Sequence, residues 1–248
     1  MERAEYERLA ALDRRLWWFR GLHAQIAGAL ERGGERSLDD RVLDAGCGTG
    51  GLLVSLRDRI AVALFGIELD EIAAAVARSA SGLPVAGGSV NQLPFPDAAF
   101  SAIVSADVLC HRGVDETAAL REFHRCLRPG GLLVLNLPAY RWMLSSHDLA
   151  VHNVRRYTAR GVHALLGPAG FTEVRTGYWN ALLFPLMVLK RKLGWRSSRE
   201  AKPASDVVLM PAPIERLFAA IMAVEASLVG AGIRFPFGGS VLATAVRP

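Results

Sequence analysis

The stretch VLDAGCGTG, residues Val42 to Gly50, decides the fold of this chain. The short apolar segment Arg41 to Ala45 predicts a strand, and Leu52, Leu53 and Leu56 predict a helix directly after the glycines. Glycine permits a tight strand-to-helix turn and lets the backbone approach a ligand closely. Because ligands of open α/β sheets lie at the carboxyl ends of the strands, we expect a ligand site at this turn.

Strands and helices alternate along the chain outward from this turn. Strands are predicted at 41–45, 61–67, 84–86, 101–105, 132–137, 171–179 and 239–246, and further helices at 5–30, 71–79, 116–127 and 158–166. This alternation predicts an α/β fold with a Rossmann-like, doubly wound and mostly parallel seven-stranded sheet.

The length of 248 residues suits one such domain with additions. The expected division is an N-terminal helical cap over 1–36, a ligand-binding core over 37–180, a helical insert or lid over 181–238, and the last core strand over 239–248. The insert is expected because a connection of this length exceeds ordinary loops and holds two apolar stretches, 181–189 and 214–229.

Composition narrows the class of protein. Apolar residues make up 51% and charged residues 21%, which indicates a folded chain. A net charge of +5 without a long Lys/Arg run argues against a nucleic-acid arm. Cys47, Cys110 and Cys126 lack CxxC spacing, so we expect no disulfide framework or zinc site and a reducing, cytoplasmic location. The charged N-terminus predicts no secretory signal, and no uncharged apolar run reaches the roughly 18 residues that span a bilayer.

Two further segments accompany the glycine turn. Glu68, in GIELD, ends the second predicted strand 22 residues after Gly46. A carboxylate there can accept hydrogen bonds from a ribose diol. The other segment is LPFPD, Leu93 to Asp97, followed by the strand that runs into Asp107.

With these segments the sequence resembles the class I S-adenosyl-L-methionine (SAM)-dependent methyltransferases. VLDAGCGTG resembles the first motif of that family, and GIELD resembles its ribose-binding strand end. LPFPDAAFSAIVSADVLCH and LREFHRCLRPGGLLVLNLP are similar to its fourth strand and to its following helix and fifth strand. The resemblance covers about residues 40 to 180.

The resemblance implies roles for residues of this chain in holding SAM. The backbone around Gly46, Cys47 and Gly48 would face the methionine part, and Asp44 would organise the loop or meet the amino group through water. Glu68 would hold the ribose hydroxyls and Leu69 would pack on adenine. The adenine edge would meet Ser89 and Val90, and Asp107 would face the methionine end.

Two positions depart from the family pattern. Ser89 stands where the family often has an Asp that accepts from the adenine amino group, and a hydroxyl can still accept one hydrogen bond. Ser101 replaces the Asp that often begins the fourth strand. Gly46 to Gly51 also fits the GxGxxG fingerprint of NAD-binding domains, but the DxGCGTG form and LPFPD favour the methyltransferases.

The acceptor pocket of this family lies near the ends of the fourth and fifth strands. Titratable groups are dense there: Tyr140, His147, Asp148, His152, Arg155, Arg156 and Tyr157. They resemble an HD…HxxRRY signature of a methyltransferase subgroup. His147, His152 and Tyr157 are the expected catalytic residues, because a His near neutral pKa can take a proton from an acceptor. The alternative is that the two histidines cap helices or pair with carboxylates.

Five residues are expected to bind the acceptor, and they are Trp17, Trp18, His111, Tyr140 and Arg156. The consecutive aromatics Trp17, Trp18 and Phe19 cannot all share one helix face, so at least one is expected to point away from the main packing surface. The alternative is that they pack onto the sheet domain. Arg156 could grip a carboxylate or phosphate, although a salt bridge is the alternative. The late segment Asn180 to Lys192 pairs an apolar run with a basic end, which suits a substrate lid, a homodimer surface or peripheral membrane contact. A plain helical cap over the core is the alternative.

The expected reaction is a direct displacement in which an O, N or C nucleophile takes the methyl group of SAM, leaving S-adenosyl-L-homocysteine. A small-molecule or lipid-like acceptor is expected, with no nucleic acid and no metal. The alternatives are a non-catalytic SAM-fold binding or regulatory protein and an NAD(P)-dependent oxidoreductase.

Overall fold

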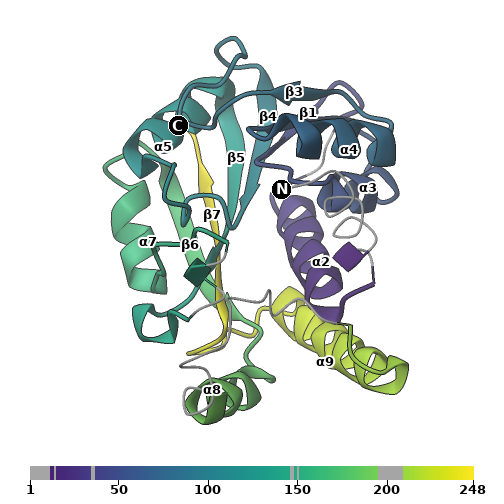
Figure 1. The fold of residues 1–248 in the computed structure, drawn as a ribbon. Helices are drawn as coiled ribbons and strands as arrows, with labels where there is room; N and C mark the ends of the chain where they lie inside the picture. Colours follow the sequence, from purple (N-terminus) through teal and green to yellow (C-terminus); the bar gives the residue numbers. More distant parts are fainter. Residues whose placement is uncertain (1–11, 14, 35–36, 146–147, 150, 195–208) are drawn as a thin grey trace.

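Seven strands form one sheet in the order β3-β2-β1-β4-β5-β7-β6 (Figure 1). The computed structural model describes residues 12–13, 15–34, 37–145, 148–149, 151–194 and 209–248. The strands are β1 (Arg41–Ala45), β2 (Ala63–Glu68), β3 (Val85–Gly87), β4 (Phe100–Ala106), β5 (Leu127–Pro138), β6 (Thr172–Trp179) and β7 (Ser240–Val246). β7 runs antiparallel to β5 and β6, whereas the other paired strands are parallel, which confirms the expected Rossmann-like sheet.

Helices cover both faces of this sheet (Figure 1). One face carries α2 (Trp17–Arg32), α3 (Gly51–Arg57) and α4 (Glu71–Ser81), and the other carries α5 (Glu116–Cys126) and α7 (Ala159–Leu166). Neighbouring residues of β1 serve opposite faces, as the period of a strand requires: Val42 packs under α2 and α3, and Leu43 packs in the core that holds α5 and α7. The parallel strands therefore lie between two apolar layers.

Side chains that directly precede three helices fix where those helices begin. Asp70 Oδ1 accepts hydrogen bonds from the amides of Ile72 (2.9 Å) and Ala73 (3.0 Å) at the start of α4. Asp115 and Thr158 cap α5 and α7 in the same way. Such caps satisfy amides that the first helical turn leaves unpaired. They also fix the loops after the strands, where a ligand site is expected.

The N-terminal helix is broken, so the expected single helix over residues 5–30 is wrong at this point. Residues 12 and 13 are helical, the backbone turns at Arg15 and Leu16, and α2 begins at Trp17. In an unbroken helix the Trp17 amide would pair four residues back. Instead it donates to Glu215 Oε2 (3.0 Å). Glu215 lies far from Trp17 in the sequence, so the helical spacing of apolar residues could not predict this contact. Residues 1–11 lie outside the described residues.

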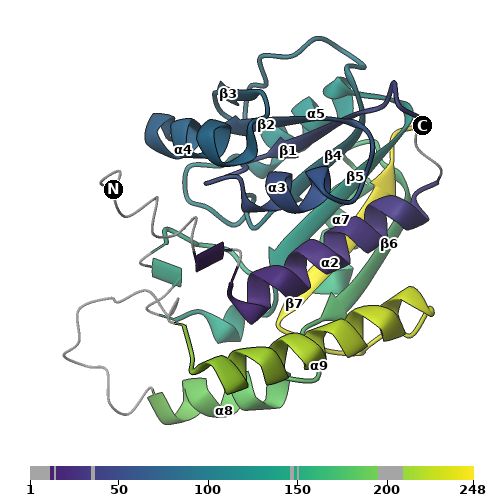
Figure 2. The same cartoon turned by 90° about the vertical axis from the view of Figure 1, so that its right-hand side faces the viewer.

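Two late helices, α8 (Phe184–Gly194) and α9 (Ala212–Gly230), occupy the region between β6 and β7. Both views place them at the same end of the molecule (Figures 1 and 2). α9 packs on α2: the Trp17 and Phe218 rings meet edge to face at 5.4 Å, and a Cβ on Gly21 would lie 3.2 Å from Met222. Within the described residues, no helix combines the length and apolarity needed to cross a membrane.

Candidate active site

The glycine turn after β1 approaches the loop after β4 closely. Gly46 has a φ of 86°, and a Cβ at this position would lie 2.3 Å from Val108 Cγ2. Gly48 has a φ of 53°. A side chain at Gly46 would therefore face both a strained backbone and a steric clash. The amides of Gly46 and Cys47 donate to the Ile67 carbonyl oxygen (2.9 and 3.0 Å), which ties this turn to the end of β2.

Glu68, at the end of β2, holds the glycine turn in place. Its Oε2 accepts a hydrogen bond from the Gly48 amide (2.9 Å), and its Oε1 accepts one from the Asp70 amide (3.0 Å). Each carboxylate oxygen has a second lone pair, so both can still accept from a ligand hydroxyl. The next side chain, Leu69, is 69% exposed. A carboxylate beside an exposed apolar side chain suits a ribose next to a planar base.

Asp44 is a buried carboxylate whose Oδ2 has no hydrogen-bond partner among the described residues. Burial, together with the nearby Glu68 and Asp13 carboxylates, raises the pKa of Asp44 to about 8. Asp13 reaches this point from the N-terminal segment, since a Cβ on Gly51 would collide with its carboxylate. Three carboxylates around one turn fit a ligand that carries positive charge.

Asp107 connects the end of β4 to the ends of β5 and β6. Its Oδ1 accepts from Asn136 Nδ2 (3.0 Å), and Asn136 Oδ1 accepts from the Trp179 indole N–H (2.7 Å). Trp18 of α2 stacks on Trp179, with centroids 6.1 Å apart. Burial raises the pKa of Asp107 to about 7, against the opposing effects of the Asn136 hydrogen bond and Arg156. Asp107 thus joins Asp44 and Glu68 at the same edge of the sheet.

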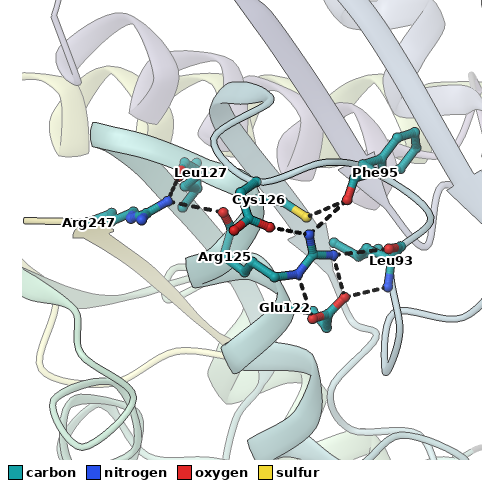
Figure 3. Close-up of polar contacts among 8 residues, drawn as sticks. Leu93, Phe95, Glu122, Arg125, Cys126, Leu127 and Arg247 are labelled. Atoms are coloured by element: carbon teal, nitrogen blue, oxygen red, sulfur yellow. Dashed lines mark hydrogen bonds and ion pairs between the residues drawn. The ribbon is translucent and has the colours of Figure 1, made fainter.

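Arg125 of α5 fixes the LPFPD segment (Figure 3). Its guanidinium donates to the carbonyl oxygens of Leu93 (3.1 Å) and Phe95 (2.8 Å). It also forms two hydrogen bonds with Glu122 (2.9 and 2.7 Å), and Glu122 accepts from the Leu93 amide (2.8 Å). These contacts hold the LPFPD segment against α5, the helix that precedes β5.

Ser89 and Val90 lie in the loop between β3 and this fixed segment. Val90 is buried, and Ser89 Oγ accepts from the Asn91 amide (3.2 Å). The Asn91 side chain reaches the loop after β4, donating to the Gly113 carbonyl oxygen (3.0 Å). On the other side of Ser89, the Gly88 amide donates to the Glu68 carbonyl oxygen (2.9 Å). The loop is therefore anchored on both sides of Ser89, and the half-buried serine is a group that can meet a ligand edge.

Arg155 and Tyr157 form a clamp on the loop after β4, which we call the 155–157 clamp. Arg155 donates three hydrogen bonds of 2.8 to 2.9 Å to backbone carbonyl oxygens of this loop, those of Leu109, His111 and Val114. The Tyr157 hydroxyl lies 2.8 Å from Glu116 Oε1 and 3.0 Å from the Leu109 carbonyl oxygen. Burial of the hydroxyl raises the pKa of Tyr157, and the hydrogen bond with the Glu116 carboxylate raises it as well. This environment favours a positioning role for Tyr157.

Arg156 forms a buried ion pair with Asp148. Its Nε and Nη2 donate to the two carboxylate oxygens (3.0 and 3.1 Å), and its Nη1 donates to the Ala139 carbonyl oxygen (2.9 Å). Asp148 also accepts from the Ser145 amide and hydroxyl (2.8 and 3.0 Å). Burial acts to raise the pKa of Asp148, but Arg156 and Ser145 hold it below its ordinary value. His147, an expected catalytic residue, lies outside the described residues.

His111 and His152 lie on two loops that the structure brings together. The Arg112 amide donates to the His152 carbonyl oxygen (3.0 Å), and His111 bridges to Asn153. Burial lowers the pKa of His111, although the nearby Glu68 carboxylate opposes this effect. A neutral imidazole has one nitrogen that can accept a proton. His152 is exposed and has a φ of 61°.

The expected aromatic acceptor residues separate into different environments. Trp18 lies against Trp179 at the strand ends, whereas Trp17 packs on α9. Tyr140 follows β5 and stacks between Trp142 (5.7 Å) and Tyr178 (5.3 Å). Burial and the Tyr178 hydroxyl raise the pKa of Tyr140 to about 12. The carboxyl ends of β5 and β6 therefore carry an aromatic cluster next to Asp107.

Sequence reasoning missed Asn136 and Trp179, which join three strand ends. Asn136 stands alone as a polar residue in the apolar strand LLVLNLP, and a buried amide needs partners. This isolated polar residue was the available signal. Trp179 gave no comparable signal, because its indole partner is 43 residues away.

Comparison with known proteins agrees with this geometry. Residues 43–135 match the model of a methyltransferase domain. A methyltransferase of Encephalitozoon cuniculi is 30% identical over 152 residues, which are 54% of this chain and 67% of that protein. A SAM-dependent methyltransferase of Mycolicibacterium smegmatis is 29% identical over 158 residues, or 62% of this chain. The chain spans 59% of the length of that second relative.

The fold of this chain is also similar to that of solved methyltransferase structures. A solved SAM-dependent methyltransferase from Thermotoga maritima superposes with a TM-score of 0.60 at 20% identity, covering 99% of this chain and 95% of that one. The chain belongs to the class I SAM-dependent methyltransferases, whose cofactor is SAM. The site residues fit this cofactor, because Asp44 offers a buried carboxylate oxygen that lacks a described partner, and Glu68 keeps unused lone pairs at both oxygens.

Proposed function

We propose that this protein transfers a methyl group from SAM to a small, lipid-like acceptor. One observation carries the proposal: the ends of β1, β2 and β4 bring Asp44, Glu68 and Asp107 to one edge of the sheet around a glycine turn fixed by the 2.9 Å hydrogen bond from Gly48. Acidic side chains gathered in this way attract a sulfonium and an ammonium group.

When bound, SAM supplies a methyl group already activated by a sulfonium. The residues of the chain then have to bind, align and exclude water. Glu68 holds the ribose hydroxyls, while Asp44 and Asp107 face the positively charged methionine end. The remaining contacts come from Leu69, Ser89 and Val90 on the adenine side and from the backbone of Gly46, Cys47 and Gly48 on the methionine side.

The acceptor side is apolar and aromatic, which favours a lipid-like molecule over a highly charged one. Trp18, Tyr140 and Trp142 lie at or near the ends of β5 and β6. Arg156, the expected anion-binding group, is committed to Asp148 instead. The helices before and after the core, α2 with α8 and α9, serve as the cover of this pocket in our proposal.

His152 and His111 are the proposed proton acceptors for an acceptor hydroxyl or amine. The 155–157 clamp holds the loop that carries His111, and Arg112 links that loop to His152. The catalytic assignments of His147 and Tyr157 stay predictions. For Tyr157 the hydrogen bond with Glu116 supports a positioning role in the clamp.

The test is the transfer of tritium by the full chain from SAM labelled at its methyl group to an acceptor, with release of unlabelled S-adenosyl-L-homocysteine. Acceptors are supplied as two sets, one of membrane lipid extracts and one of water-soluble amines, acids and phenols. We expect label in the organic phase with the lipid set, and at least tenfold less with the Glu68→Ala variant at a SAM concentration below the wild-type Kd. SAM binding without product from either set would favour the non-catalytic alternative. Label in the water-soluble set alone would overturn the lipid-like acceptor.

A further inference from the structure

Helix α9 turns its carboxylates toward the protein interior and apolar side chains toward the outside. It has three charged residues, and both carboxylates point inward. Glu215 accepts from the amides of Trp17 and Met210 (both 3.0 Å), and Glu225, with none of its surface exposed, accepts from the amides of Ala181 (2.9 Å) and Leu182 (3.0 Å). An ordinary surface helix turns its polar residues toward water and its apolar residues toward the core.

The outward side of α9 is apolar instead. Leu217 and Val224 are each 56% exposed, and Ile214 is 40% exposed. Arg216 is the remaining charged residue of this helix, and it is exposed. A contiguous exposed apolar surface on a folded protein marks an interaction site.

Further exposed apolar side chains lie on helix α8 and next to it. Leu186 and Leu189 of α8 are about half exposed, as is Leu182 just before it. Trp142 of η1 (Arg141–Met143) is 60% exposed, and its ring meets Phe184 at 6.2 Å. α8 and α9 lie at the same end of the molecule in both views (Figures 1 and 2). We call the exposed apolar side chains of α8, α9 and η1 the α8–α9 face.

The charge around the α8–α9 face identifies its partner. In the described residues from 180 to 248 the carboxylates are Glu215 and Glu225, both buried. The exposed charges there are Lys190, Arg216 and Arg234. A second copy of the chain would bring like charges together across a two-fold axis. An anionic lipid surface instead can bury the leucines and the tryptophan among its acyl chains, while its negative charge attracts the cationic side chains.

We propose that the α8–α9 face docks on an anionic membrane surface. The register supports this placement, because β5 ends at Pro138 and β6 ends at Trp179, both opposite Ser240 of β7. The chain leaves this edge directly into Leu182 and α8, so the face lies beside the proposed acceptor pocket. The docking itself does not depend on methyl transfer, although it would present lipid-like acceptors to that pocket.

The experiment measures flotation of the full chain with vesicles of phosphatidylcholine alone and with about 30 mol% phosphatidylglycerol. We expect binding to the anionic vesicles that is at least tenfold stronger than to neutral ones and that weakens at high salt. The double variants Leu186→Glu/Leu189→Glu and Leu217→Glu/Val224→Glu should each bind at least tenfold more weakly. Leu38→Glu is the matched control, because Leu38 is 79% exposed in the turn before β1, at the opposite edge of the sheet.

SAM affinity, measured by calorimetry, shows that each variant is folded, and it separates this proposal from the proposed function. The docking proposal is overturned if wild-type protein does not float with anionic vesicles, or if both double variants bind like Leu38→Glu. It is also overturned by a stable dimer that the Leu217→Glu/Val224→Glu variant dissociates, since the α8–α9 face would then be the interface between two copies. Vesicle binding without any methyl transfer would leave the docking proposal intact and contradict the proposed function.

Discussion

Replacing Asp44 with Asn should make the protein less sensitive to pH. The folded protein holds the Asp44 proton up to a pH near 8, because burial raises its pKa, whereas the ordinary value is 3.8. Between these values the unfolded state binds fewer protons than the folded state. A rise in pH therefore favours unfolding of the wild-type protein through this group.

The size of the effect follows from the difference in bound protons. One proton difference changes the free energy of unfolding by about 1.4 kcal/mol per pH unit. Both pH 5 and pH 7 lie between the pKa values of Asp44 in the unfolded and folded states. Raising the pH from 5 to 7 therefore lowers the free energy of unfolding by about 2.7 kcal/mol through Asp44 alone. Asp107, whose pKa is raised to about 7, contributes the same loss of stability to wild type and to Asp44→Asn, so its effect cancels when the two are compared. Asn has nearly the same shape as Asp and does not titrate.

Urea unfolding of wild type and Asp44→Asn at pH 5 and pH 7, both without SAM, measures this difference. We expect the pH-dependent loss of stability to be smaller by about 2 to 3 kcal/mol in the variant, with the variant the more stable protein at pH 7. SAM affinity should fall in the same variant, because a bound cation favours the ionised form of Asp44 and Asn has no ionised form. An unchanged pH slope would refute the buried, protonated Asp44.

Three further substitutions test other parts of the site. His152→Ala should lower kcat about 100-fold with SAM affinity unchanged by calorimetry, and full activity would remove His152 from the catalytic residues. Arg156→Ala removes the bidentate ion-pair partner of buried Asp148 and leaves Arg191 at 3.6 Å, so urea unfolding at pH 7 should show a loss of about 3 kcal/mol that shrinks as the pH falls and Asp148 takes up a proton; a loss below 1 kcal/mol would argue against the pair. Gly46→Ala should destabilise the protein by about 1 to 3 kcal/mol and abolish SAM binding, because its Cβ would lie 2.3 Å from Val108; normal SAM affinity would contradict this close approach.

The sequence predicted the strands and the glycine turn because both depend on local patterns. Strand β1 spans Arg41–Ala45 as expected, and β7 begins at Ser240, one residue after the predicted start. The expected helix over residues 5–30 was wrong where Glu215 takes the Trp17 amide, since that contact joins residues 198 positions apart. No local pattern can reveal such a partner.

The acceptor side was harder to predict than the cofactor side. Glu68 follows a strand end, so its spacing to Gly46 places it beside the turn. Arg155 and Arg156, in contrast, are consecutive and identical in type, yet one holds backbone carbonyl oxygens and the other a buried carboxylate. Only the packing of their surroundings separates these two roles.

The central claim is that Glu68 and the glycine turn hold SAM. Calorimetric titration of wild type and Glu68→Ala with SAM, with NAD(P) as the competing ligand class, tests it most directly. The account predicts one SAM site per chain, affinity at least tenfold weaker in Glu68→Ala while the fold is retained, and no heat with NAD(P). Absence of SAM binding in wild type, or equal affinity in both proteins, would contradict it.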